Sequence, residues 1–174
     1  MRIFVGGSLR VVPRDLPQCR EFATALGREI VKLGHVVLNG CRSLLDTEVA
    51  RSAHEWLVSN GGNPEEMIIS YCHRDAQPAH SFGRVRASAL PDWQMNHPEL
   101  QIPEQIDLAG ATIFVAGGEG TFWAKNWAFY ARKPILGIPR FGGAGETIYY
   151  QEVARLRESF AAAAEEYDSR SLSR

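Results

Sequence analysis

The sequence lacks two features that would place the protein in a membrane or on nucleic acid. None of its apolar runs approaches the roughly 18 residues of a membrane-spanning helix. Its 19 basic and 20 acidic side chains leave a formal net charge of -1, so it has no excess of positive charge with which to coat nucleic acid or an anionic membrane. Any anion that the protein binds must therefore be held by a local arrangement of groups.

Cysteine is scarce, and Cys19, Cys41 and Cys72 lie far apart without forming a metal-type pair. Unpaired thiols are typical of proteins in a reducing compartment, so we expect a cytoplasmic protein without disulfides. His73 and His80 likewise have no cysteine or histidine at the spacing of a zinc site. We therefore expect neither a metal nor a resident cofactor.

The length and composition fit one folded domain. The chain has 174 residues, of which 45% are hydrophobic and 22% are charged, as in an average globular protein. No internal repeat or linker divides it. We expect a single ligand-binding domain over residues 1–167, followed by a flexible tail over residues 168–174.

Short apolar runs alternate with helically spaced apolar residues along the chain. Parallel strands need crossover helices between them, so this alternation predicts a three-layer Rossmann-like α/β sandwich with a parallel sheet of at least five strands, in the order 3-2-1-4-5. We expect strands near residues 2–6, 35–40, 67–72, 112–116 and 133–139, and helices near 17–34, 44–58, 103–109, 122–132 and 149–163. Residues 73–101 contain Pro78, Pro91 and Pro98 and are expected to form an irregular insert.

Glycine clusters follow the first and fourth expected strands. They are Gly6-Gly7-Ser8 and Gly117-Gly118-Glu119-Gly120-Thr121. In an open parallel sheet the ligand crevice lies beyond the carboxyl ends of the strands, where the strand order reverses, here between strands 1 and 4. Glycine lets backbone N–H groups approach a phosphate, and a helix N-terminus adds partial positive charge. Thr121 is expected to cap the helix or to bind a phosphate oxygen.

The two clusters together predict a phosphate-bearing ligand, and a nucleotide is the first candidate. They match neither the dinucleotide-binding fingerprint nor the Gly-Lys-Thr ending of a P-loop, so hydride transfer and phosphoryl transfer lose their usual sequence support. A tight strand-to-helix turn without a ligand remains the alternative interpretation of residues 117–120.

The expected fold places several other side chains at or near the same edge. Gly40 and Arg42 follow the second strand, where the guanidinium would hold a phosphate or pair with a surface acid. Glu146 follows the fifth strand and would accept hydrogen bonds from ribose hydroxyls or stabilise a helix N-terminus. Arg84 and Arg86, in the insert, would close over a pyrophosphate or face solvent.

Glu119 and the nearby aromatic residues also have two interpretations each. Glu119 would repel a phosphate, so it is expected to bind a ribose hydroxyl or to face solvent. Phe141 lies in a loop and is the preferred candidate for stacking on a base. Trp123 and Trp127 are one helical turn apart and are expected to pack in the core or at a dimer interface rather than on a base.

Three segments in the second half of the chain carry a family resemblance. The resemblance is to the SLOG superfamily and rests on residues 105–121, which end in the motif AGGEGT, on RKPILGIP at 132–139 and on FGGAGE at 141–146, with weaker support from VGGS at 5–8. That superfamily includes LONELY GUY cytokinin-activating enzymes, molybdenum cofactor carrier proteins, the core of DNA-processing protein A, and sensor domains that accompany sirtuin-type and TIR domains in bacterial antiphage systems. The resemblance covers the whole order of strands and helices.

One departure from the superfamily bears on catalysis. Its hydrolase branch has Pro-Gly-Gly-x-Gly-Thr followed by a glutamate that acts at the ribose, whereas here Ala116 replaces the proline and Ala124 occupies the glutamate position. Alanine cannot transfer a proton, so phosphoribohydrolase activity of that type is not expected. Residues 141–146 resemble the sensor branch, which implies an NAD-derived ligand such as ADP-ribose, cyclic ADP-ribose, NAD or AMP.

The leading hypothesis is therefore a nucleotide sensor in bacterial signalling or antiphage defence. The resemblance implies a homodimer or larger homo-oligomer, with a separate effector protein as a further partner. One alternative is an enzyme of the phosphoribohydrolase or deoxyribosyltransferase kind, with Glu119 or Glu146 as the carboxylate that acts on the N-glycosidic bond. The other is a carrier of a phosphorylated pterin, as in the molybdenum cofactor branch.

Overall fold

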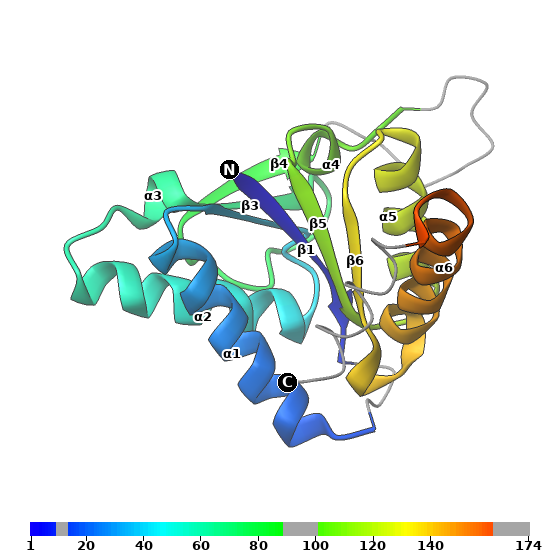
Figure 1. Cartoon of the computed structure of the whole chain (residues 1–174). Coiled ribbons are helices and arrows are strands. Elements are labelled where there is room, and N and C mark those ends of the chain that lie inside the picture. Colours follow the sequence, from blue (N-terminus) through cyan, green and yellow to red (C-terminus); the bar gives the residue numbers. More distant parts are fainter. Residues whose placement is uncertain (10–13, 89–100, 162–174) are drawn as a thin grey trace.

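The computed structural model describes residues 1–9, 14–88 and 101–161. Strands from these residues form one parallel sheet in the order β4-β3-β2-β1-β5-β6 (Figure 1). The strands are β1 (Arg2–Ser8), β2 (Val36–Asn39), β3 (Ile68–His73), β4 (Arg84–Ser88), β5 (Ala111–Ala116) and β6 (Ile135–Ile138).

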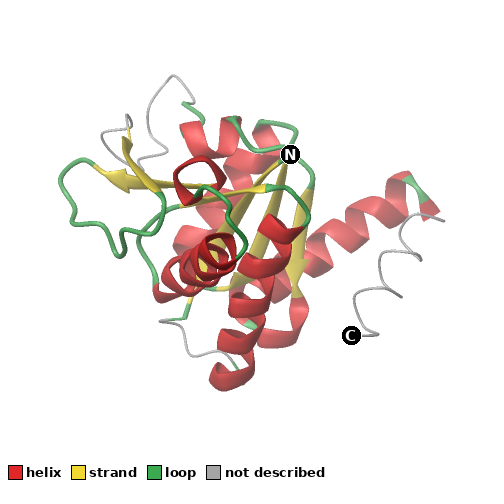
Figure 2. Cartoon of the chain, turned by 90° about the vertical axis from the view of Figure 1, so that its left-hand side faces the viewer, coloured by secondary structure: helices red, strands yellow, loops and turns green. Residues whose placement is uncertain are grey.

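Helices connect the strands and cover both faces of the sheet, as Figure 2 also shows. Helices α1 (Leu16–Lys32) and α2 (Leu44–Ser59) lie on one face, and α5 (Glu119–Tyr130) and α6 (Gly143–Ser159) lie on the other. Three short elements complete the connections: α3 (Pro64–Met67), α4 (Glu104–Asp107) and the 3-10 turn η1 (Pro139–Phe141). No helix in the described ranges is both long enough and apolar enough to cross a bilayer.

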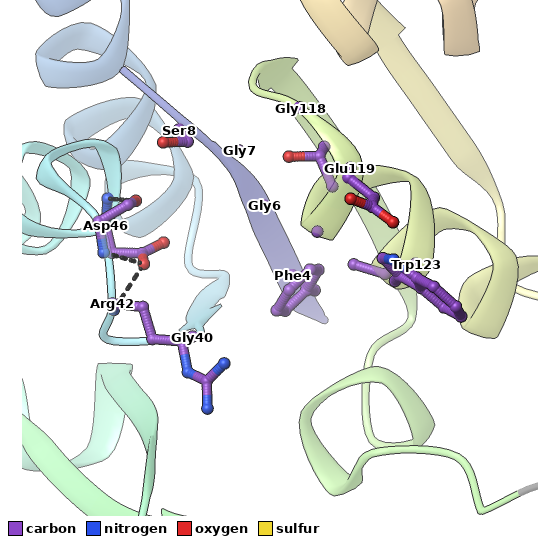
Figure 3. A pocket seen from close by; sticks show the side chains of 14 residues that line it. Phe4, Gly6, Gly7, Ser8, Gly40, Arg42, Asp46, Gly118, Glu119 and Trp123 are labelled. Atoms are coloured by element: carbon purple, nitrogen blue, oxygen red, sulfur yellow. Dashed lines mark hydrogen bonds between the residues drawn. The ribbon is translucent and has the colours of Figure 1, made fainter. Parts of the chain in front are cut away.

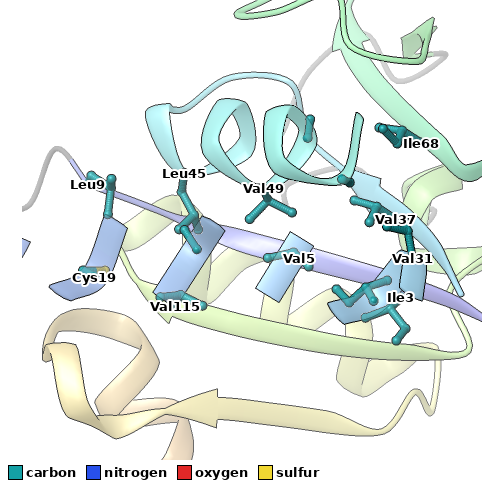
Figure 4. Packing of buried hydrophobic residues seen from close by; sticks show 14 of the residues in the cluster. Ile3, Val5, Leu9, Cys19, Val31, Val37, Leu45, Val49, Ile68 and Val115 are labelled. Atoms are coloured by element: carbon teal, nitrogen blue, oxygen red, sulfur yellow. The ribbon is translucent and has the colours of Figure 1, made fainter. Parts of the chain in front are cut away.

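The central strand β1 supplies side chains to both hydrophobic cores, because successive residues of a strand point to opposite faces. Val5 packs with Val37 and Val49 beneath α1 and α2 (Figure 4). Its neighbour Phe4 packs on the other face, where its ring meets that of Phe114 edge-on at 6.2 Å between centroids. This double burial explains the continuous apolar run from which the strand was predicted.

The expected Rossmann-like sandwich is confirmed, and the five expected strands keep the order 3-2-1-4-5 within the sheet. The prediction for the insert was wrong at residues 84–88, which form β4 parallel to β3 at the edge of the sheet. Hydrophobic periodicity carries little signal for this strand because it lies at an edge and its side chains are largely exposed. The rest of the insert at residues 89–100 and the expected tail at residues 168–174 lie outside the described residues.

Candidate functional site

A crevice of about 540 Å³ opens at the carboxyl end of β1, between the first turns of α2 and α5 (Figure 3). The pairing of β1 with β5 sets Ser8 beside Ala116, so the two glycine clusters leave the sheet at the same edge. The crevice thus lies where the strand order reverses, as expected for a parallel sheet. It is lined by these predicted site residues: Gly6, Gly7, Ser8, Gly40, Arg42, Gly118, Glu119, Gly120 and Thr121.

The glycines of β1 are required by the packing of the protein itself. A Cβ atom at Gly7 would overlap the backbone carbonyl of Val115 and lie 2.6 Å from a methyl group of Leu45. A Cβ at Gly6 would lie 2.8 Å from the ring of Phe4. These glycines let β1 pass closely beneath its neighbours and form the floor of the crevice.

The turn from β5 into α5 has a backbone that restricts its sequence. Ala116 and Gly117 both have positive φ angles, 47° and 82°. Proline is fixed near a φ of -65°, so it cannot replace Ala116 in this turn. A Cβ at Gly117 would overlap the hydroxyl of Thr121, and the Gly117 carbonyl accepts a hydrogen bond from the N–H of Ala144 at 2.9 Å. Gly117 therefore lies beneath the crevice and supports it, rather than lining it as predicted.

The first turn of α5 has no side-chain cap. The N–H of Thr121 donates to the carbonyl of Gly118 at 3.0 Å. The N–H groups of Glu119 and Gly120 have no acceptor among the described residues. Because the first N–H groups of a helix point outward along its axis, these two donors are available to a ligand in the crevice.

The first turn of α2 faces the same crevice and is closed by its own side chains. The Ser43 hydroxyl accepts a hydrogen bond from the N–H of Asp46 at 3.1 Å. One oxygen of the Asp46 carboxyl group, Oδ2, accepts the N–H groups of Arg42 at 2.8 Å and Ser43 at 2.9 Å. Asp46 is 5% exposed, and this burial raises the pKa of its carboxyl group. This capping box leaves the start of α2 less suited to an anion.

Gly40 and Gly120 lie near the two ends of the crevice and have no packing reason to be glycine. A Cβ at Gly120 would meet nothing within 4 Å, and one at Gly40 would come only within 3.9 Å of Asp46 Oδ2. Neither residue has a positive φ angle. The space beside these two glycines is therefore open within the protein and accessible to a ligand.

The remaining walls combine apolar and charged side chains. Phe4 lies at the floor and Trp123 on α5, across the crevice from the exposed Arg42 (Figure 3). Glu119 also lines the α5 side, and its side chain is exposed. In the described part of the chain, no three His, Cys, Asp or Glu side chains gather in an arrangement that would hold a metal ion.

The structure places three predicted site residues away from the crevice. Phe141 is 2% exposed and packs against the ring of Phe22 at 5.4 Å, so the prediction that it stacks on a base was wrong. Glu146 instead accepts a hydrogen bond from Arg14, with 2.7 Å between Nη2 and Oε2. Arg84 begins the edge strand β4, which is separated from β1 by the two strands β2 and β3. None of these three side chains therefore lines the crevice.

Several crevice residues were missed by sequence reasoning: Phe4, Ser43, Asp46, Trp123 and Ala124. The Ser43-x-x-Asp46 spacing just after β2 is a helix-capping signature and could have drawn attention to this turn. Of the two tryptophans, Trp127 is buried in the core as predicted, and Trp123 also packs against that core but lines the crevice as well. No spacing rule separates these roles, because both residues lie on the inner side of one helix.

No family model matches the sequence, and no curated protein matches it either. Solved structures do match the fold. The protein TM1055 is 21% identical, with a TM-score of 0.65 over 84% of this chain and 79% of its own. The molybdenum cofactor carrier protein of Chlamydomonas reinhardtii is 19% identical, with a TM-score of 0.65 over 97% of this chain and 98% of its own.

A more distant match is DNA processing protein A from Helicobacter pylori, a structure described for its single-stranded DNA binding mode. It is 12% identical, with a TM-score of 0.55 over 87% of this chain and 72% of its own. The chain has the Rossmann-like fold of these proteins. The molybdenum cofactor carrier and DNA processing protein A are of the kinds named in the SLOG resemblance, and at these identities the likeness shows a shared fold.

Proposed function

We propose that the protein is a binding module for a phosphate-bearing nucleotide of the NAD-derived or ADP-ribose class. The observation that carries this proposal is the first turn of α5. There the N–H groups of Glu119 and Gly120 lack an acceptor among the described residues, and the space beside Gly120 is empty. Such donors, together with the positive end of the helix dipole, are the usual protein partners of a phosphate group.

The rest of the crevice suits the other parts of a nucleotide. Its volume of about 540 Å³ falls within the range of about 300–1,000 Å³ that is typical of small-molecule sites. Trp123 offers apolar surface to a flat base, and Arg42 places a positive charge at the rim. Ala124 supplies no carboxylate at the position where the hydrolase branch of the SLOG superfamily has its glutamate. This composition favours binding over cleavage.

Calorimetric titration with ADP-ribose, cyclic ADP-ribose, NAD and AMP tests the proposal. We expect at least one of them to bind with a Kd below about 100 μM, and binding by none at millimolar concentration would defeat it. Liberation of free adenine from AMP would contradict a pure binding role. It would favour the N-glycosidic enzyme with Glu119 as its carboxylate, since Glu146 lies outside the crevice.

Gly120→Ala is the sharpest variant for the phosphate position. The new methyl group enters space that is empty in the protein, and alanine stabilises a helix relative to glycine by up to about 1 kcal/mol. We therefore expect an unchanged or higher melting temperature together with at least tenfold weaker binding of the best nucleotide. Unchanged affinity would show that the phosphate does not lie at α5.

A carrier of the molybdenum cofactor is the second candidate function, because the carrier protein from Chlamydomonas matches nearly the full length of both chains. A phosphorylated pterin shares a phosphate group and a flat heterocycle with a nucleotide, so the same features of the crevice would serve it. A co-purifying ligand with pterin fluorescence, released on denaturation, would favour the carrier. An adenine spectrum would favour the nucleotide sensor.

The sensor proposal includes a homo-oligomer and a separate effector protein. Exposed aromatic side chains on α5 and α6 support an interface between copies of the chain, because large exposed aromatics commonly mark protein contacts. Phe129 is 49% exposed, Tyr130 is 58% exposed and Tyr150 is 60% exposed. Light scattering should give the mass of a dimer or larger assembly, and Tyr150→Glu should reduce it to that of a monomer.

A further inference from the structure

The carboxyl group of Asp46 is only half used by the helix cap. Its Oδ2 atom accepts both backbone N–H groups, those of Arg42 and Ser43. Its other oxygen, Oδ1, accepts no backbone N–H group of the described residues although Asp46 lines the crevice, and among those residues the Ser43 hydroxyl is the one side chain that bonds the carboxyl group. Figure 3 shows the carboxyl group at the wall formed by α2, directed toward the crevice. A hydrogen-bond acceptor therefore faces the ligand space from this wall.

The capping bonds hold that acceptor in place. Two N–H groups fix Oδ2, and the N–H of Asp46 is itself bound by Ser43, so the side chain has little rotational freedom left. Burial at 5% exposure also limits its access to water. An acceptor that is fixed and poorly hydrated discriminates strongly between a ligand that donates a hydrogen bond and one that does not.

The surroundings define what can approach Asp46. The side-chain position of Gly40 is open and lies only 3.9 Å from Oδ2, which leaves room for a ligand group next to the carboxylate. A phosphate is disfavoured there by like charge, whereas a hydroxyl group is neutral and can donate. The first turn of α5 differs, because the N–H groups of Glu119 and Gly120 have no acceptor among the described residues and the Glu119 carboxylate there is exposed to solvent rather than buried.

We propose that Asp46 recognises a sugar hydroxyl of the ligand, which then lies with its phosphate at the start of α5 and its sugar at the start of α2. The inference rests on the proposed nucleotide-binding function and adds an orientation and a specificity-determining residue to it. Asp46 acts here as a binding residue that selects ribose-bearing ligands over deoxygenated ones. The capping box thus has a second role beyond starting a helix.

Asp46→Asn is the matched test, because it keeps the size of the side chain while removing its negative charge and the acceptor at Oδ1. The amide oxygen of asparagine can still accept the N–H groups of Arg42 and Ser43, while an NH₂ donor replaces the acceptor that faces the crevice. The probes are AMP, 2′,3′-dideoxy-AMP and inorganic pyrophosphate, titrated into the wild type and the variant. The melting temperature of the variant should stay close to that of the wild type.

We expect the wild type to bind AMP at least tenfold more tightly than dideoxy-AMP. The Asp46→Asn variant should bind the two within about twofold of each other and should bind pyrophosphate no more weakly than the wild type. Thr47→Ala serves as the control for a merely structural role, since the Thr47 hydroxyl donates to the Ser43 carbonyl at 3.2 Å in the same turn but Thr47 does not line the crevice. It should retain the preference for AMP.

The possible failures have separate meanings. If Asp46→Asn keeps the full preference for AMP, or if Thr47→Ala loses it equally, the inference is overturned while the nucleotide-binding function stands. If the wild type binds AMP and dideoxy-AMP equally, no hydroxyl is recognised and the inference is again overturned. If the wild type binds none of the three probes, the proposed function fails, and the inference fails with it.

Discussion

Helices α2 and α5 both begin at the crevice, yet their first turns meet their hydrogen-bonding needs in opposite ways. At α2, Ser43 and Asp46 bond the N–H groups, and an acidic side chain is left facing the ligand space. At α5 no side chain caps the turn, and Glu119 and Gly120 keep two N–H groups without acceptors. A helix N-terminus is thus an anion site only when the chain leaves its donors unused. Capping residues at such a turn therefore decide the chemistry of the ligand beside it.

The difference between the first turns of α2 and α5 can be removed by giving α5 the cap that α2 has. Gly118→Ser would place a hydroxyl at the N-cap position of α5, where it can accept an N–H of the first turn. We expect pyrophosphate and AMP to bind at least thirtyfold more weakly, or about 2 kcal/mol, because the donors are then engaged within the protein. Stability should change by only a few tenths of a kcal/mol, since serine and glycine differ little at an N-cap. Calorimetry and thermal melting would measure the two effects, with Gly118→Ala as the control that lacks a hydroxyl.

Removing the cap from α2 should lower the stability of the protein and leave its affinity for nucleotides nearly unchanged. Ser43→Ala deletes the acceptor for the N–H of Asp46, and the loss of such a cap costs about 1 kcal/mol of stability. We expect urea denaturation to show a decrease of that size, with nucleotide affinity unchanged within about twofold. A tenfold loss of affinity would mean that the two ends of the crevice are coupled and would weaken the contrast between them.

The raised pKa of the Asp46 carboxyl group should make the stability of the protein depend on pH. Burial raises its pKa in the folded protein above 3.8, so the folded state holds this proton more tightly than the unfolded state. Its contribution to stability is therefore most favourable at low pH and is lost as the pH rises from about 3.8 through the folded-state pKa. The two N–H groups bound to Oδ2 offset part of the desolvation that raises this pKa.

Urea denaturation of the wild type and Asp46→Asn across pH 3–7 would measure this difference. The stability of the variant should increase relative to that of the wild type as the pH rises through this window and should stay constant above it. His80 provides a reference in both proteins, since burial lowers its pKa to about 4 and its contribution is lost as the pH falls from 6.5 toward that value. A relative stability that falls with rising pH would contradict the raised pKa of Asp46.

Arg42 at the rim should have the smallest effect. Its side chain is exposed, and an exposed charge contributes about 0.5 kcal/mol to an ion pair in water. Arg42→Gln should weaken AMP binding two- to threefold at low ionic strength, and the difference should disappear near 0.5 M salt, where screening is strong. A loss that persists at high salt would mean that the guanidinium holds the ligand directly in a buried contact.

The order of the elements could be predicted because it depends on local pattern. Buried parallel strands need continuous apolar runs such as Ile3–Val5, and the helices between them need apolar stripes and end signals such as Gly34. The position of the crevice then followed from the topology, since the carboxyl ends of β1 and β5 must share one edge. The edge strand β4 was not predicted because its largely exposed residues do not form an apolar run.

The roles of individual side chains depended on contacts between distant segments. Phe141 looked available for stacking from its loop position, but the ring of Phe22 on α1 buries it. Glu146 looked available to a ribose, but Arg14 pairs with it across 132 positions of sequence. Asp46 looked like an ordinary helix residue, although the end of β2 and the floor of β1 bring it to the crevice wall. No local pattern contains the partner that decides each of these roles.

The alternation of strands and helices and the two glycine clusters at the switch point can be read from the amino-acid order, because both follow from local hydrophobicity and backbone freedom. The role of each glycine depends instead on contacts between distant segments. At Gly7 the carbonyl of Val115 fills the space a side chain would need, whereas at Gly120 that space is empty. A glycine in the sequence shows that a side chain is absent at that position. The neighbouring residues in the folded protein show whether the space is filled by protein atoms or left open for a ligand.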